Sequence, residues 1–166
     1  MVQHLLSFIK EQNIESLEPV YDEDHPIGAT GEMRTWFTSK PATLTVRSHI
    51  SHVIGDSSWE QYAANIFEKS NAVLSYAKND HLGFQVFYLW RGSRRRYVPD
   101  FLVRLSNGNT LVLEIKGVDS PQNRAKRDAL GEWVKAVNSV GGFGRWCCDV
   151  AFEPAKIQDI IAKHAA

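Results

Sequence analysis

The stretch Leu111-Val-Leu-Glu-Ile-Lys-Gly117 decides how the chain is interpreted, because it is an apolar run that holds two charged residues. Such a run predicts a buried β-strand, here from Thr110 to Lys116. Side chains two residues apart in a strand share a face, so Glu114 and Lys116 should project together. Burying a carboxylate and an ammonium in this way costs stability unless each has a partner or a chemical task. The strand is therefore predicted to carry a functional site.

The preceding strand brings a third charged group to this site. It is predicted over Tyr97 to Leu105, and the turn Ser106-Asn-Gly108 joins it to the strand that carries Glu114. In a three-residue loop whose glycine is in the left-handed region, Asp100 lies directly opposite Glu114. A two-residue Asn-Gly turn would place Asp100 opposite Ile115 instead and would separate the carboxylates. We predict the three-residue loop.

Two carboxylates that face each other repel, and both stay ionised most easily when a cation lies between them. Oxygen ligands that leave room for water suit Mg²⁺ or Mn²⁺. Such an ion can activate a water and neutralise the charge that builds on a phosphate, while a lysine orients the water or holds the phosphoryl oxygens. Asp100, Glu114 and Lys116 are therefore predicted to form the active site of a phosphodiester hydrolase.

The flanking elements are predicted from helical and strand-like periodicity. Before the site, two strand-like runs are predicted over Glu32 to Thr38 and Thr43 to Ile54, and a helix capped by Ser58 over Trp59 to about Ala77. A strand over Gly83 to Trp90 and a basic turn over Arg91 to Arg96 follow. After the site, a helix capped by Ser120 is predicted over Pro121 to about Ser139, a strand over Arg145 to Phe152 and a last helix over Pro154 to His164. The order from Trp59 onward, α-β-β-β-α-β-α, predicts an α/β fold with helices packed on a mixed sheet. Residues 58–166 are expected to form this core, and residues 1–57 an extension with a short helix near Leu5, a linker and the strand-like runs.

The composition limits the classes of protein to which the chain can belong. Its 166 residues suffice for one domain, and 43% hydrophobic with 23% charged residues is typical of a folded, soluble chain. No apolar run approaches the roughly 20 residues that span a bilayer, and two adjacent cysteines fit a reducing compartment, so we expect a cytoplasmic protein without a membrane partner. Nineteen basic residues balance nineteen acidic ones, which argues against tight autonomous DNA binding but not against a catalytic module. The chain has no phosphate-binding loop, so we expect no ATP site.

The spacing of Val98-Pro-Asp100 and Glu114-Ile-Lys116 resembles that of the PD-(D/E)xK nuclease superfamily. The family resemblance implies a restriction-endonuclease-like core in the order α-β-β-β-α-β. Further fragments resemble the C-terminal endonuclease domain of type III restriction enzyme Res subunits and related helicase-nucleases, and together they cover residues from about Thr35 to the end. These fragments are Asp56-Ser-Ser-Trp-Glu60, Lys78-Asn79, Leu82-Gly-Phe84, Tyr97-Val-Pro-Asp-Phe101, Leu113-Glu-Ile-Lys-Gly117, Trp133-Val-Lys-Ala-Val-Asn138 and Phe143-Gly-Arg-Trp146.

The resemblance assigns roles to individual residues. It implies Asp100 and Glu114 as metal ligands, the backbone carbonyl of Ile115 as a further ligand, and Lys116 as the catalytic lysine. The superfamily often adds a glutamate from the first helix, for which Glu60 and Glu68 compete. Glu60 borders the apolar face of that helix whereas Glu68 points nearly opposite it, so Glu60 is the predicted ligand. The resemblance also implies a helicase or ATPase region upstream in a longer polypeptide and a Mod-type methyltransferase partner.

Two sets of residues are candidates for DNA contact. Gln122 and Lys126 lie in the first turns of the helix after the catalytic strand, where a helix N-terminus favours phosphate, although both could equally extend from the helix edge into solvent. Some relatives have Gln-x-x-x-Tyr here, whereas this chain has Gln122-Asn-Arg-Ala-Lys126. The arginines Arg94, Arg95 and Arg96 lead directly to Asp100 and could grip phosphates, although an exposed hairpin is also a usual place for solvated charge.

Other interpretations use the same residues differently. Asp100, Glu114 and Lys116 could be a salt-bridge ladder on a half-exposed hairpin. The fold could also serve as a non-catalytic DNA-binding or assembly module, for which loss of Asp100 or Lys116 would have argued. Among enzymes, the rival is a repair or junction-resolving nuclease that acts as an independent dimer on branched DNA.

Overall fold

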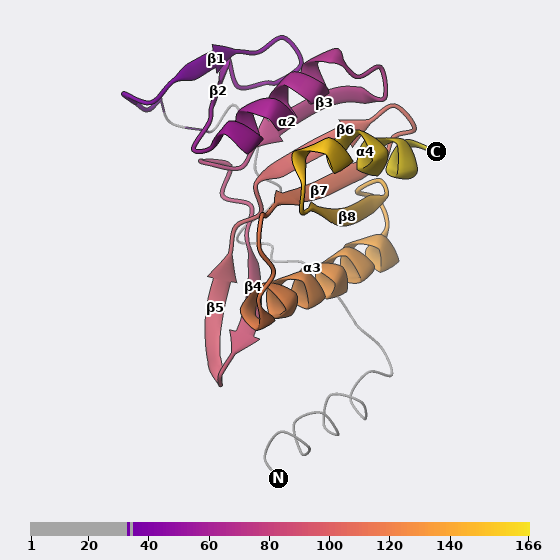
Figure 1. Ribbon diagram of the computed structural model, residues 1–166. Coiled ribbons are helices and arrows are strands. Elements are labelled where there is room, and N and C mark those ends of the chain that lie inside the picture. The colour runs from indigo at the N-terminus through magenta and orange to yellow at the C-terminus, as the bar shows by residue number, and fades with distance from the viewer. Residues whose placement is uncertain (1–32, 34) are drawn as a thin grey trace.

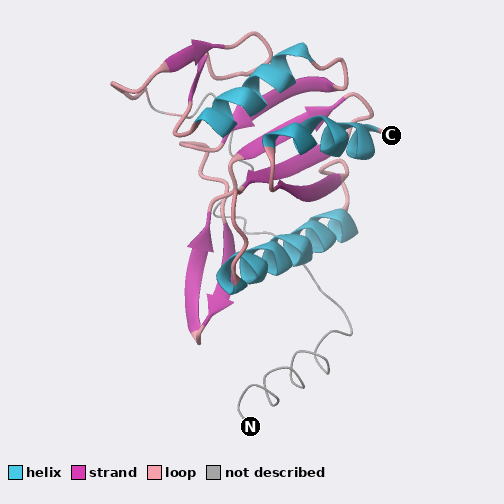
Figure 2. Cartoon of the chain, in the orientation of Figure 1, coloured by secondary structure: helices cyan, strands magenta, loops and turns pink. Residues whose placement is uncertain are grey.

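The computed structural model describes residue 33 and residues 35–166 of the chain. The helix predicted near Leu5 and most of the predicted linker lie outside the described residues. The described part is a mixed α/β fold, as predicted, with sheets flanked by helices (Figure 2). None of the described helices is both long enough and apolar enough to cross a membrane.

A four-stranded mixed sheet forms the centre of the fold (Figure 1). Its order is β3-β6-β7-β8, in which only β7 and β8 run parallel. The strands are β3 Val73–Lys78, β6 Phe101–Leu105, β7 Thr110–Ile115 and β8 Trp146–Ala151.

Helices cover both faces of this sheet because its strands bury alternate residues on opposite sides. Helices α2 Ser58–Lys69 and α4 Ile157–Ala165 pack on one face, where Phe67, Leu111 and Leu113 are buried together. Helix α3 Pro121–Val140 covers the other face, where Val112 and Leu130 are buried. Strand β7, which carries Glu114, thus lies between two hydrophobic layers.

The prediction of one helix from Trp59 to Ala77 was wrong. Helix α2 ends at Lys69 because Ser70 adopts an extended conformation. The backbone N–H of Ser70 still donates to the Ile66 carbonyl. The residues that follow form β3, in which Val73 and Tyr76 are buried against the sheet. Val73, Leu74 and Ala77 fit a helical stripe equally well in sequence, and pairing with β6 decided for the strand.

The cap of α2 also differs from the prediction. Ser57, not Ser58, is the N-cap, and its Oγ accepts a hydrogen bond from the Glu60 backbone N–H at 3.2 Å. The Ser57 hydroxyl donates to Glu60 Oε1 at 3.2 Å, and the Asp56 N–H donates to Glu60 Oε2 at 3.1 Å, so Ser57 and Glu60 form a variant of the capping box. Since Ser57 and Ser58 are adjacent in sequence, only the position of Glu60 distinguishes them.

The segment predicted as strand Gly83 to Trp90 does not join the central sheet. Its strand β4 Val86–Trp90 pairs with β5 Ser93–Tyr97 in a separate two-stranded ribbon. Most of the predicted basic turn is therefore strand, because Arg91 and Gly92, with φ of 51° and 77°, form a tight two-residue connection. The predicted strand from Tyr97 to Leu105 is split between β5 and β6.

The element order α-β-β-β-α-β is present, but its first strand is β3 rather than the predicted strand from Gly83 to Trp90. It is made by α2, β3, β6, β7, α3 and β8, and the β4–β5 ribbon is inserted between β3 and β6. Figure 1 shows the ribbon extending away from the sheet beside the start of α3.

The loop between β6 and β7 is the predicted three-residue loop. Gly108 has a φ of 86°, and its N–H donates to the Leu105 carbonyl at 2.9 Å. Leu105 N–H in turn donates to the Asn109 carbonyl at 2.8 Å, and the ladder continues through Phe101 opposite Leu113. This register confirms the predicted three-residue loop, and Asp100 directly precedes the first residue of β6.

The extension before α2 is a short hairpin rather than two long strands. The predicted run from Thr43 to Ile54 is two strands, β1 Ala42–Leu44 and β2 His52–Ile54, since residues 45–51 turn back and Thr45 N–H bonds the Ser51 carbonyl at 3.0 Å. The described residues of the run Glu32 to Thr38 form no strand.

The remaining elements follow the predictions closely. Ser120 caps α3 by accepting a hydrogen bond from Asn123 N–H at 3.2 Å, and Gly141 ends that helix. The predicted last helix is a 3₁₀ turn, η2 Pro154–Lys156, continued by α4.

Candidate active site

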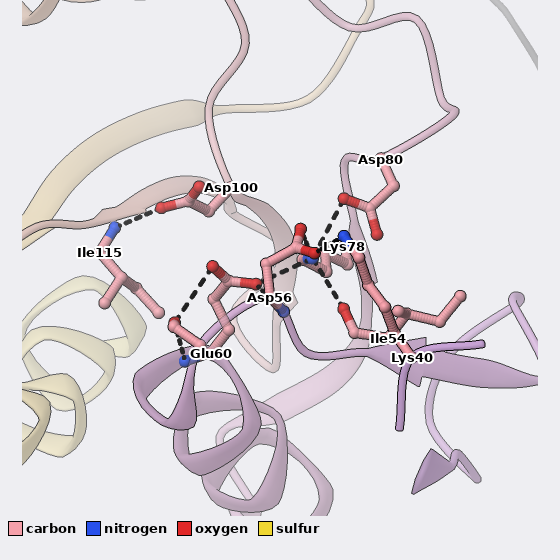
Figure 3. A network of polar contacts seen from close by, with 9 residues as sticks. Lys40, Ile54, Asp56, Glu60, Lys78, Asp80, Asp100 and Ile115 are labelled. Carbon is pink, nitrogen blue, oxygen red and sulfur yellow. Dashed lines mark hydrogen bonds and ion pairs between the residues drawn. The ribbon is translucent and has the colours of Figure 1, made fainter. Parts of the chain in front are cut away.

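Asp100 lies just before β6 begins and Glu114 just before β7 ends, close enough for their charges to interact. Both side chains are half-buried. Asp100 Oδ2 accepts a hydrogen bond from the Ile115 backbone N–H at 2.7 Å (Figure 3). Glu114 shares its strand face with Val112, and so it points toward α3.

The two carboxylates raise the cost of each other's charge. Burial, and next the charge of Glu114, raise the pKa of Asp100 to about 7, against the opposing effect of the Ile115 N–H. Burial also raises the pKa of Glu114, although a hydrogen bond from Tyr97 and the charge of Lys116 oppose this. At neutral pH such a pair favours either a shared proton or a bound cation.

Cationic side chains surround Glu114. A small pocket between β7 and α3 is lined by Tyr97, Glu114, Lys116, Asn123, Lys126, Arg127 and Val150. Lys116 and Lys126 both lower the pKa of Glu114 through their charges. The pocket thus joins the predicted catalytic lysine and one predicted DNA contact to the same carboxylate. The guanidinium of Arg127 forms two hydrogen bonds with the carboxylate of Asp119, from Nη1 at 2.7 Å and from Nη2 at 2.9 Å.

Tyr97 is a site residue that sequence reasoning missed. Its hydroxyl donates to Glu114 Oε2 at 2.9 Å. Burial and the charge of Glu114 hold the pKa of Tyr97 well above its usual value, so this hydroxyl remains a donor. The Lys126 ammonium lies 5.3 Å from the centre of the Tyr97 ring. The signal in the sequence was the position of Tyr97 just before Val98-Pro-Asp100.

Glu60 is on the Asp100 side of α2, and Glu68 is not. The charge of Glu60 contributes to the raised pKa of Asp100. Glu68 instead accepts hydrogen bonds from the backbone of the β1–β2 loop and from the Tyr76 hydroxyl, at 2.9 Å for the latter. Glu60 is nevertheless engaged by its capping box and by Lys78. Within residues 35–166 no group of three or more His, Cys, Asp or Glu side chains is arranged to hold a metal.

Lys78 is the second site residue that sequence reasoning did not single out. Only 6% of its side chain is exposed, and its ammonium lies 2.9, 2.8 and 3.1 Å from carboxylate oxygens of Asp56, Glu60 and Asp80 (Figure 3). It also donates to the Ile54 carbonyl at 2.7 Å. Burial alone would lower the pKa of Lys78, but the hydrogen bonds to the carboxylates raise it. Lys78 is therefore a permanent cation, and its charge lowers the pKa of Asp100.

Asn79 holds the backbone of Asp100 in place. Its N–H donates to the Asp100 carbonyl at 2.8 Å, and its side-chain amide donates to the carbonyls of Pro99 at 2.9 Å and Phe84 at 2.8 Å. The buried side chain of Asn79 thus supplies donors for two backbone carbonyls next to Asp100. The pair Lys78-Asn79 thus supports Asp100 through both charge and backbone.

The oxygen atoms near Asp100 fit a hard cation in their chemistry. Ile115 N–H faces Asp100, while Lys116 N–H faces β8 and donates to the Ala151 carbonyl at 2.9 Å. Since the N–H and C=O of one strand residue point the same way, the Ile115 carbonyl is on the Asp100 edge. Two carboxylates and this carbonyl are ligands that Mg²⁺ accepts while it keeps several waters.

Other predicted DNA contacts lie away from the carboxylates. Gln122 donates to the Tyr88 hydroxyl at 2.7 Å, so it ties α3 to the ribbon and does not line the pocket. Arg94, Arg95 and Arg96 are exposed on β5. Models of known protein families, curated proteins and solved structures were compared with the chain, and none matches it.

Proposed function

We propose that this chain is a metal-dependent DNA endonuclease domain with a restriction-endonuclease-like core. The observation that carries the proposal is the proximity of Asp100 and Glu114, two half-buried carboxylates whose charges interact, with Lys116 beside Glu114. The order α2-β3-β6-β7-α3-β8 supports it, because the PD-(D/E)xK resemblance implies this order.

Each side chain has a role in this proposal. Asp100, Glu114 and the Ile115 carbonyl would hold Mg²⁺ or Mn²⁺, with Glu60 as a further ligand once it leaves Lys78. The bound ion would supply Lewis-acid activation of a water and of the scissile phosphate. Lys116 orients the attacking water, and Lys126 binds a non-bridging phosphate oxygen from the same pocket. Tyr97 fixes the carboxylate of Glu114.

The domain would act within a longer restriction or helicase-nuclease polypeptide. The resemblance to type III Res subunits supports an ATP-driven region and a Mod-type methyltransferase partner. These would supply ATP hydrolysis and DNA affinity to a chain that has neither a phosphate-binding loop nor a net positive charge. Delivery by these partners would replace strong autonomous binding.

One observation favours a second candidate, a non-catalytic DNA-binding or assembly module. Glu60 is held by Ser57 and Lys78, and no three-ligand group is present among the described side chains. Under this alternative the raised pKa of Asp100 reflects burial without metal. The two candidates differ in whether Asp100 is needed for metal binding.

The decisive experiment measures cleavage and metal binding in the same variants. Wild type should nick supercoiled plasmid with Mg²⁺ or Mn²⁺ and not with EDTA, whereas Asp100→Asn and Lys116→Ala should lose at least about a hundredfold in rate. The exposed residues Asp159 and Lys135 provide the matched controls Asp159→Asn and Lys135→Ala, which should cleave normally. Mn²⁺ binding by calorimetry gives a readout that does not need cleavage: binding by wild type and its loss in Asp100→Asn is expected. Equal binding by both proteins, or cleavage that survives EDTA, would refute the proposal.

A further inference from the structure

The β4–β5 ribbon concentrates positive charge in a chain whose charges otherwise balance. Residues 83–98 contain four arginines and no carboxylate, whereas the whole chain has 19 basic and 19 acidic residues. Within the described part of the chain, none of the four arginines forms an ion pair with a carboxylate. Unpaired charge of one sign on a protruding element is typical of a surface that binds a polyanion.

The inner face of the ribbon is anchored. Val86, Tyr88 and Tyr97 are buried against α3, and the Tyr88 hydroxyl accepts a hydrogen bond from Gln122 at 2.7 Å. Figure 1 shows the two strands extending away from the sheet beside the start of α3. The ribbon is therefore held at a defined angle to the rest of the fold, and a ligand on it would be held likewise.

The outer face of the ribbon, defined here as Phe87, Leu89, Arg94 and Arg96, is open. Pairing places Arg94 opposite Leu89 and Arg96 opposite Phe87, so strand alternation puts all four on the side away from Tyr88. Phe87 is 47% and Leu89 is 66% exposed. The Arg94 guanidinium lies 4.0 Å from the centre of the Phe87 ring, which holds its donors at a fixed place. Arg95 is opposite Tyr88 and belongs to the inner side.

The tip of the ribbon places one more arginine where the backbone disfavours it. Arg91 has a φ of 51°, in the left-handed region that glycine or asparagine adopts at lower cost. Its guanidinium lies 5.6 Å from the centre of the Trp90 ring. The two-residue turn requires this positive φ, and the arginine that occupies it adds a fourth positive charge at the tip of the ribbon.

We propose that the outer face, together with Arg91, is an arm that binds duplex DNA in the major groove. A two-stranded ribbon fits this groove, which is about 12 Å wide, and arginines contact both its phosphates and its guanines. Phe87 and Leu89 supply apolar contacts of the kind that thymine methyl groups accept.

The arm leads to the active site. Tyr97, the last residue of β5, donates to Glu114, and Asp100 follows three residues later. DNA gripped by the arm is thereby positioned for the carboxylates. The inference rests on the proposed function only in taking DNA as the ligand.

The test measures binding of the full chain to a labelled duplex in EDTA by fluorescence anisotropy, with no cleavage involved. Arg94→Gln and Arg96→Gln should each weaken binding several-fold, and each should lower the slope of log K against log salt by about 0.9, the value of one phosphate contact. Arg95→Gln removes the same charge from the inner side and should change binding by less than about twofold if the outer face makes the contacts. Thermal unfolding of each variant checks that the fold is retained.

Several results would overturn the arm. These are equal losses in the Arg94, Arg95 and Arg96 variants, tighter binding of single strands than of duplex, or no duplex binding by wild type at low salt. A chain that binds duplex through the outer face but never cleaves it would refute the nuclease and leave the arm intact. Mn²⁺ binding by wild type and Asp100→Asn tests the nuclease, and duplex binding by Arg94→Gln and Arg95→Gln tests the arm, which separates the two proposals.

Discussion

The carboxylate of Asp100 accepts a hydrogen bond from the backbone N–H of Ile115 at 2.7 Å, so it lies beside the strand that carries Glu114. This relationship depends on the three-residue loop that ends at Gly108. A loop one residue shorter would shift the strand register so that Asp100 comes opposite Ile115 and its side chain no longer shares a face with Glu114. The position of one glycine therefore determines whether the two carboxylates meet.

The pH dependence of the free energy of unfolding should show that the charged form of Asp100 destabilises the folded protein. Its pKa in the folded protein is about 7, above the ordinary value of 3.8, so the folded state binds its proton more tightly and loses stability as pH rises from about 4 to 7. Asp100→Asn should therefore stabilise the metal-free protein by about 2 kcal/mol at pH 8 and by well under half of that at pH 5. Urea unfolding in EDTA at both pH values measures this. A variant that is equally destabilised at both would contradict it.

The cluster around Lys78 predicts an asymmetric pair of substitutions. Lys78→Met leaves Asp56, Glu60 and Asp80 without their common cation and should cost about 3 kcal/mol, because a nearly buried charge network loses its centre. Lys40 contacts the same Asp56 but is 59% exposed, so Lys40→Met should cost less than about 0.5 kcal/mol. Denaturant unfolding compares them. Similar losses in both variants would mean that Lys78 is no more than a surface ion pair.

Removal of the Tyr97 hydroxyl should alter the titration of Glu114. The hydrogen bond at 2.9 Å lowers the pKa of Glu114, so Tyr97→Phe should raise it and move the acidic limb of the cleavage pH profile to higher pH. The loss in stability should be about 1 kcal/mol. Tyr88→Phe removes the hydrogen bond that the Tyr88 hydroxyl accepts from Gln122. It should lower the stability by a similar amount without moving the pH profile. An unchanged profile in Tyr97→Phe would exclude the assigned role.

Two glycines should respond to alanine in opposite ways. Gly108 has a φ of 86°, so Gly108→Ala should destabilise the protein by about 1 kcal/mol and loosen the pairing of Asp100 with Glu114. Gly131 lies within α3, where an added methyl meets nothing within 4 Å, so Gly131→Ala should stabilise by about 0.5–1 kcal/mol. Thermal unfolding distinguishes the two signs, and a stabilised Gly108→Ala would contradict the loop geometry.

The predictions that failed involve segments whose local pattern fits two structures. Val73 to Lys78 carries apolar residues at positions that suit both a helix and a strand, and pairing with β6 selected the strand. The arginines before Tyr97 resemble a turn in composition, yet Arg91-Gly92 alone makes the turn. The predictions that held, the β6–β7 loop and the cap of α3, depend on residues close together in the chain.

The sequence by itself determined the strand that carries Glu114 and ends just before Lys116, the register of this strand with β6, and the mixed α/β class, because alternation and turn geometry act over a few residues. Only the tertiary structure decided that Lys78 sits among three carboxylates, that Tyr97 meets Glu114, and that Arg94 and Arg96 share an outer face apart from Arg95. These contacts join segments many residues apart in the chain. Their energies depend on which strands pair and which helix covers them, and no local pattern encodes that choice.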